Sequence, residues 1–86
     1  MEEICLDVAK VFGKVIRDMR IEAGMTQEQL GLEADLRRTF ISILELGQQQ
    51  PTLTTLIKLA RALKCPAHEI VAKFDNACGN LNIDKN

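Results

Sequence analysis

Few residues of this 86-residue chain could carry covalent or metal chemistry. His68 is the single histidine, and no acid, base or nucleophile stands at a recognisable catalytic spacing from it. The three cysteines, Cys5, Cys65 and Cys78, are widely spaced and lack the Cys-x-x-Cys pair of many metal sites. We therefore expect no catalysis, no metal, no cofactor and no small-molecule ligand. His68 is expected in the solvated first turn of a helix.

The odd number of cysteines also argues against a disulfide framework, so we expect reduced thiols. Cys5 and Cys65 fit burial as small apolar side chains. Cys78 stands near the C-terminus, where a reactive surface thiol is expected.

Charge is spread unevenly over a chain whose net charge is only −1. Residues 1–36 carry eight acidic and four basic side chains, whereas residues 37–64 carry five bases and the single acid Glu45. Local sign matters more for binding than the sum, so the second segment is the candidate for an anionic partner. No apolar run reaches the length of a membrane span, and the acidic start Met1-Glu2-Glu3 is unlike a signal peptide. A cytoplasmic protein without membrane contact is expected.

Composition and periodicity predict an all-α fold. Aromatic residues make up 3% of the chain, so a core must come from aliphatic side chains on helices. Apolar spacing of three and four residues predicts five helices. They cover Val8 to about Ala23, Thr26–Ala34, Arg38–Leu46, a helix with the stripe Leu53, Leu56, Leu59, Ala60 and Leu63, and one opened by Pro66 that carries Ile70, Val71 and Phe74. One domain (1–78) and a short polar tail (79–86) follow.

Local residues set the limits of these helices. Thr26 and Gln29 have the spacing of a capping box, which satisfies backbone N–H groups at a helix start. Asp35 tolerates the left-handed geometry of a tight turn between the second and third helices. The other limits come from two helix-stopping glycines and a capping threonine: Gly24, Gly47 and Thr52.

Two short helices joined by three or four residues form a helix-turn-helix unit, which by spacing alone is weak evidence of function. The ordered set of residues is more specific, and it resembles the lambda/Cro-type repressor family, also called the XRE family. The matching residues are Thr26, Gln27, Leu30, Asp35, Leu36, Ile41, Ser42, Glu45, Gly47, Pro51, Leu56, Ala60 and Leu63. The resemblance covers Phe12 to Val71. It implies a compact five-helix, lambda-repressor-like domain whose second helix crosses the DNA backbone and whose third helix lies in the major groove.

The first residues of the third helix are the expected base contacts. An Arg such as Arg38 can bind O6 and N7 of guanine together, and Thr39 can contact a thymine methyl group. The resemblance adds Ser42 and Ile43, which match the family's groove-facing positions. Leu46, like Ile43, is expected to face away from the core.

The expected DNA-backbone contacts are Gln27, Arg37, Gln48 and Gln49. Gln27 stands in the first turn of a helix, where its amide and the free N–H groups can meet a phosphate oxygen, as family members similarly do. The family's frequent Lys/Arg-rich loop is replaced here by three neutral glutamines, residues 48–50. Because neutral side chains displace no counterions, binding should depend less on salt.

These features predict a sequence-specific DNA-binding transcriptional regulator that is not an enzyme. One helix contacts only a few base pairs, so we expect a homodimer on a palindromic operator, with Val71 and Phe74 at its interface. Residues 36–42 resemble the controller proteins of restriction–modification systems. The alternative is a protein-interaction module in which the helix-turn-helix is only scaffold, since fold does not fix function.

Overall fold

Five α-helices make up the regular structure of residues 7–79, the part of the chain that this computed structural model describes. They are α1 (Val8–Glu22), α2 (Gln27–Ala34), α3 (Arg38–Glu45), α4 (Leu53–Ala62) and α5 (Ala67–Cys78). No strand occurs between residues 7 and 79, and the all-α prediction is confirmed. The third helix ends at Glu45, one residue before its predicted end, with Leu46 as its cap. Of the predicted tail, only Gly79 belongs to the described residues.

Local hydrogen bonds set the helix ends much as predicted. The Thr26 hydroxyl accepts from the Gln29 backbone N–H (3.0 Å), and the Gln29 side chain accepts from the Thr26 N–H (2.8 Å), which completes the capping box. Thr52 caps α4 through the Thr55 N–H. Such caps contribute on the order of 1 kcal/mol each. The residues predicted to end helices have the expected left-handed geometry, with positive φ at Gly24 (73°), Gly47 (74°) and Asp35 (57°).

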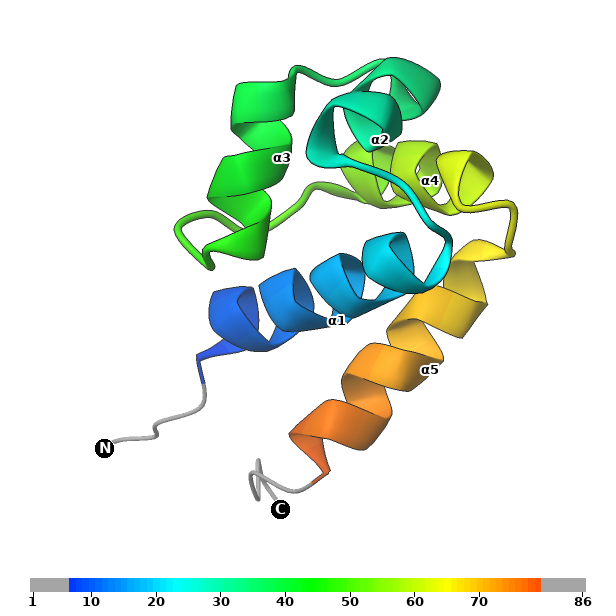
Figure 1. Ribbon diagram of the computed structural model, residues 1–86. Helices are drawn as coiled ribbons and strands as arrows, with labels where there is room; N and C mark the ends of the chain where they lie inside the picture. The colour runs from blue at the N-terminus through cyan, green and yellow to red at the C-terminus, as the bar shows by residue number, and fades with distance from the viewer. Residues whose placement is uncertain (1–6, 80–86) are drawn as a thin grey trace.

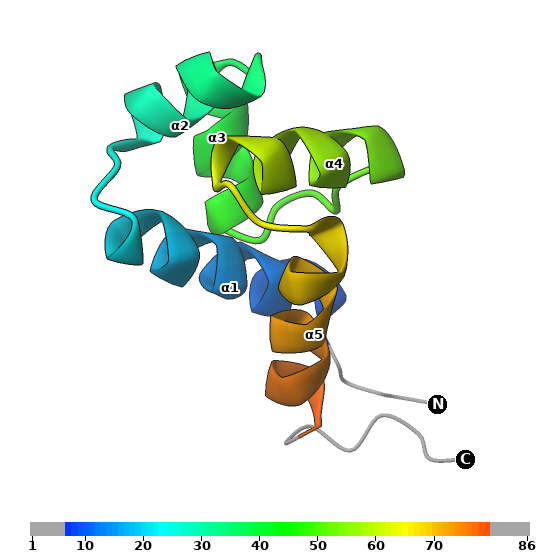
Figure 2. The same ribbon diagram turned by 90° about the vertical axis from the view of Figure 1, so that its right-hand side faces the viewer.

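The helices pack as a small bundle in which α2, α3 and α4 stand above α1 (Figure 1). α1 packs against α3 and α5, α2 packs against α3 and α4, and α4 packs against α5. In the view from the side, α5 runs downward from the end of α4 past α1 (Figure 2). Among the described residues, no helix is long and apolar enough to cross a bilayer.

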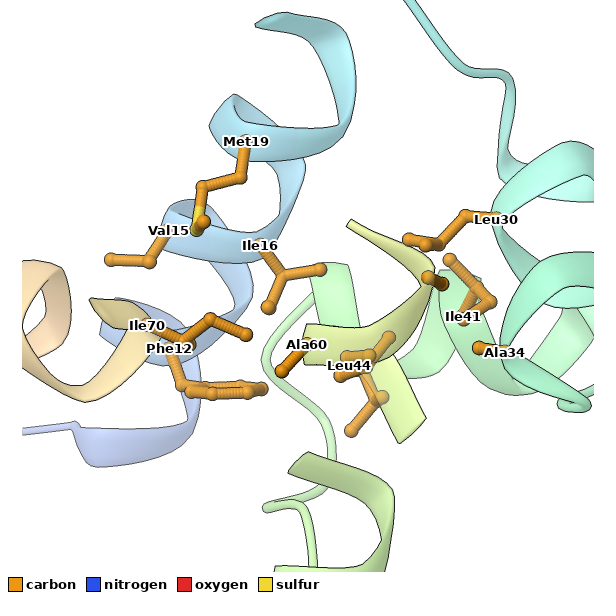
Figure 3. Close-up of a cluster of buried hydrophobic side chains, with 12 residues drawn as sticks. Phe12, Val15, Ile16, Met19, Leu30, Ala34, Ile41, Leu44, Ala60 and Ile70 are labelled. Carbon is orange, nitrogen blue, oxygen red and sulfur yellow. The ribbon is translucent and has the colours of Figure 1, made fainter. Parts of the chain in front are cut away.

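The core is aliphatic, as the composition predicted. Figure 3 shows side chains such as Ile16, Leu30 and Leu44 converging from α1, α2 and α3. Each of these three is fully buried, and burial of such a side chain contributes about 1.5–3 kcal/mol. The core therefore holds α3 by its Ile41 and Leu44 side and leaves the opposite side free.

One residue of the predicted α4 stripe is exposed, while Leu56 and Leu63 are half-buried and pack against the core. Leu53 is 78% exposed, and Thr55 is buried in its place. Leu53 lies six residues, and hence about 120° of rotation, from the fully buried Leu59. The prediction for Leu53 was therefore wrong because the buried side of α4 is centred closer to Leu59.

The prediction of a surface thiol at Cys78 was also wrong. Cys78 is 1% exposed because it follows Ile70 and Phe74 at four-residue steps on the inner side of α5. Cys65 is half-buried, close to what was expected, and Cys5 lies outside the described residues. Burial, and then the neighbouring Asp75, raises the pKa of the Cys78 thiol. His68 is exposed in the first turn of α5, as predicted.

Cys78 is therefore expected to react with a water-soluble thiol reagent only when the protein opens. The pKa shift adds to this protection, because the folded state holds the thiol proton more tightly than the unfolded state does. The same shift stabilises the fold at neutral pH, and this contribution is lost as the pH rises through the folded-state pKa. Labelling with a maleimide followed by peptide mass mapping should show Cys78 modified at the rate of unfolding. Immediate modification of Cys78 in the native protein would contradict the structure.

Candidate nucleic-acid interface

A tight turn joins α2 to α3 and fixes the angle between them. Asp35 is left-handed, and the Leu36 N–H donates to the Gly31 carbonyl (2.8 Å). A Cβ atom on Gly31 would come within 2.6 Å of the Leu36 carbonyl oxygen, so this position has no room for a larger residue. Leu36 then packs against the core. The turn thus presents Arg37 and the start of α3 to solvent.

The four predicted base contacts share the outer side of α3. Arg38 and Thr39 are exposed, and Ser42 and Ile43 are half-exposed. Their spacing places the second pair one helical turn beyond the first. Leu46 extends this surface at 61% exposure, as predicted. An eight-residue helix is about 12 Å long, and this one presents a continuous row of side chains of the size that a major groove admits.

The N-terminus of α3 is arranged to receive an anion. Arg37 occupies the cap position but makes no side-chain capping bond, and the first turn contains no acidic residue. The backbone N–H groups of Arg38 and Thr39 have no partner within the helix. Two arginines beside the positive end of a helix dipole are unfavourable in the isolated domain. A phosphate at this end would relieve the repulsion.

The remaining predicted backbone contacts lie at two other places. Gln48 and Gln49 are exposed in the loop after α3, at the opposite end of that helix from Arg37. Gln27 is the first residue of α2 and is half-buried. Its side-chain Nε2 donates to Glu45 Oε1 at 3.0 Å. Gln27 is thus joined to the last residue of α3.

Sequence reasoning missed a buried ion pair behind this surface. Arg20 donates to both carboxylate oxygens of Glu45, through Nε (2.6 Å) and Nη2 (3.1 Å), and through Nη1 to the Met25 carbonyl (2.8 Å). The two side chains are only 12% and 4% exposed. The hydrogen bond to Glu45 raises the pKa of Arg20, against the opposing effect of burial. The pair ties α1 to α3 and to the loop before α2.

The spacing of these two residues in the sequence could have predicted this ion pair. Arg20 follows Ile16 by four residues, and Glu45 follows Ile41 by four. Both charged residues therefore fall in line with a fully buried isoleucine. Two opposite charges, each on the inner side of its own helix, indicate partners, because an unpaired buried charge is strongly unfavourable.

The predicted dimer-interface residues lie together at the α4–α5 side of the domain. Val71 is 47% exposed. Phe74 is half-buried, and its ring packs against Phe12 with 6.5 Å between ring centroids. The two residues line an apolar groove of about 220 Å³ together with Leu56 of α4 and Phe12 of α1. Leu53 and Ile57 on α4 are further exposed apolar side chains.

Metal binding finds no support in residues 7–79, where no three His, Cys, Asp or Glu side chains are grouped to hold an ion.

Comparison with known proteins agrees with this geometry. Residues 16–70 match the helix-turn-helix family HTH_3. The chain is 34% identical over 70 residues to the uncharacterized HTH-type transcriptional regulator y4dJ of Sinorhizobium fredii, covering 81% of this chain and 91% of that protein. It is 36% identical over 58 residues to the control protein C.BamHI of Bacillus amyloliquefaciens, covering 66% and 72%. The crystal structure of the restriction–modification controller protein C.AhdI of Aeromonas hydrophila superposes with a TM-score of 0.69 at 34% identity, covering 74% and 91%.

Proposed function

The chain belongs to the helix-turn-helix family of DNA-binding transcriptional regulators, and on that premise we propose that it binds a palindromic operator as a homodimer. This family is not one of enzymes, in agreement with the sequence-based expectation. The observation that supports the proposal best is the outer side of α3, which offers solvent-facing polar residues next to an uncapped, arginine-rich helix start. A cytoplasmic location is part of the proposal, because an operator-binding protein must reach the chromosome.

Base reading is assigned to α3. Arg38 is the proposed guanine contact, Thr39 and Ile43 can meet thymine methyl groups, and Ser42 can donate to or accept from a base edge. Backbone contacts are assigned to Gln27, Arg37, Gln48 and Gln49, which would fix the register of α3 in the groove. Mutations distinguish the two groups. Loss of a backbone contact weakens binding to all DNA sequences alike, whereas loss of a base contact changes the preference at one base pair.

Fluorescence anisotropy would test DNA binding directly. The purified protein is titrated onto duplexes from upstream of its own gene and onto a scrambled duplex, at about 150 mM salt and at several lower concentrations. Specific binding is expected to exceed binding to the scrambled duplex by roughly a thousandfold or more. Because residues 48–50 are neutral, the affinity for DNA should fall only weakly as the salt concentration rises. Equal and weak binding to a genome-wide set of fragments would instead favour the protein-interaction alternative.

Replacing Arg38 with alanine is expected to weaken operator binding by about 1–3 kcal/mol and to relax specificity at one base pair of each half-site. The reason is loss of the bidentate contact to guanine. Arg61→Ala is the matched control, because it removes the same charge from an exposed position on α4. A panel of operators with single base-pair changes measures both effects. Equal losses on every duplex would contradict a base-reading role for Arg38.

The homodimer is proposed to form through the apolar surface of α4 and α5. A single recognition helix contacts too few base pairs for useful specificity, so two copies are needed on half-sites about 34 Å apart. Val71 and Phe74 line the apolar groove, and Leu53 and Ile57 are further exposed apolar side chains on α4. A second copy presenting the same surface would bury these side chains on both subunits.

Val71→Asp is expected to shift the protein from dimer to monomer, because two carboxylates would face each other in an apolar contact. Sedimentation equilibrium measures the change, and operator affinity should fall with it. Ile21→Asp is the control, since Ile21 is a similarly exposed apolar residue (55%) on α1. An unchanged dimer in Val71→Asp, or equal loss in Ile21→Asp, would place the interface elsewhere.

The similarity to C.BamHI and C.AhdI extends the proposal to a role like that of a controller protein. Whether transcription rises or falls would follow from the position of the operator relative to the promoter, which footprinting would locate.

A further inference from the structure

The buried acid at the end of α3, Glu45, contacts a residue of the proposed DNA-binding surface. Glu45 Oε1 accepts from two donors at once, Arg20 Nη2 (3.1 Å) and Gln27 Nε2 (3.0 Å). Its side chain is 4% exposed, so Glu45 itself is not available to solvent or DNA. Gln27, in contrast, is half-buried at the first position of α2. One carboxylate oxygen thus joins an interior ion pair to a residue at the surface.

A carboxylate can orient a glutamine amide in one way only. It accepts hydrogen bonds and cannot donate them, so Gln27 must turn its nitrogen, and not its oxygen, toward Glu45. The amide nitrogen carries two hydrogens about 120° apart. Glu45 takes one of them, which leaves the other fixed in direction at the N-terminus of α2. A phosphate oxygen is the kind of acceptor that this second N–H suits.

Arg20 makes this arrangement compatible with DNA. A lone carboxylate beside a phosphate would repel it, but the guanidinium binds both oxygens of Glu45 and offsets the charge. The exposed Glu28, in the first turn of α2, remains an unfavourable charge nearby. Because Glu28 repels a phosphate, the Gln27 N–H binds that phosphate more tightly when it is already held in position than when it must first be ordered.

We infer that Glu45 is a positioning residue that holds the Gln27 amide for a DNA phosphate. This inference rests on the proposed function and deepens it, since it assigns Glu45 and Arg20 to the affinity of the DNA contact as well as to the fold. Positioning of a backbone contact raises affinity for all sequences equally and leaves base discrimination unchanged.

A double-mutant cycle tests the coupling. Gln27→Met removes the amide at similar size, and Glu45→Gln replaces the acceptor-only carboxylate with an amide that can also donate and so no longer fixes the orientation of Gln27. Each single variant is expected to weaken the operator and the scrambled duplex by the same factor, about 5-fold, and the double variant is expected to bind like Gln27→Met alone. Val15→Ala, a buried change on α1 in a pocket shared with Lys73 and Ala77 of α5, controls for reduced stability, and all affinities refer to the folded fraction.

The possible outcomes separate this inference from the proposed function. The positioning role would be wrong if the loss of affinity in the double variant equalled the product of the two single losses. It would also be wrong if Glu45→Gln bound DNA as tightly as wild type. Neither result would contradict DNA binding itself. If neither Gln27→Met nor Arg38→Ala changes binding to any duplex, the proposed function fails with it.

A measurement on the unaltered protein covers the case in which Glu45→Gln does not fold. In the NMR spectrum of the ¹⁵N-labelled protein, one side-chain amide proton of Gln27 should be protected from solvent exchange. The other should shift when duplex is added. Equal, fast exchange of both protons in the free protein would contradict the fixed orientation.

Discussion

Replacing Arg20 with methionine is expected to lower the free energy of unfolding by about 3–5 kcal/mol. The change leaves the Glu45 carboxylate, 4% exposed, without its charged partner, and it removes the donor to the Met25 carbonyl. In a domain of this size each kcal/mol corresponds to roughly 4–8 °C in Tm. Circular dichroism during thermal and urea unfolding would measure the loss.

Two further variants separate an unpaired charge from a lost contact. Arg20→Met combined with Glu45→Leu removes both charges, so most of the lost stability should return, as it does when apolar residues replace a buried pair. Lys14→Met breaks the exposed pair with Asp18, whose side chains are 77% and 62% exposed, and should cost less than about 1 kcal/mol. If Arg20→Met and Lys14→Met proved equally mild, the pair would not be buried as described.

Replacing Gly13 with alanine is expected to destabilise the fold by about 2 kcal/mol, although alanine favours helices. Gly13 lies where α1 crosses the end of α3, and a Cβ atom would come 2.3 Å from the Leu44 carbonyl oxygen and 2.7 Å from that of Glu45. These are backbone atoms, which cannot rotate away as a side chain can. α3 would have to move, so operator affinity should fall with the Tm.

Gly79→Ala is the control for this prediction. It follows α5 with an ordinary helical φ, and the nearest atom to its Cβ would be the Asn76 carbonyl oxygen at 3.3 Å. A change within roughly 0.5 kcal/mol is expected there. Unfolding curves of the two variants, together with anisotropy titrations, make the comparison. A Gly13→Ala protein as stable as wild type would show that the α1–α3 crossing is looser than the structure has it.

The sequence by itself determined the helices and their limits, because the interactions that set them act within four residues. The capping box of Thr26 and Gln29, the left-handed Asp35 and the stop at Gly47 are all local features. The solvent-facing side of α3 was predictable for the same reason. Once Ile41 and Leu44 are assigned to the core, helical periodicity places Arg38 and its neighbours outside.

Tertiary structure decided which distant groups meet. Arg20 and Glu45 are 25 residues apart, and their pairing depends on how α1 crosses α3. The packing of α2 against α3 places Gln27 beside Glu45, so this candidate contact is held by a buried acid. Burial of Cys78 likewise depends on the rotation of α5 against its neighbours. Periodicity tells which side of a helix turns inward, but only packing between helices, set by side-chain shape across the core, fixes what that side touches.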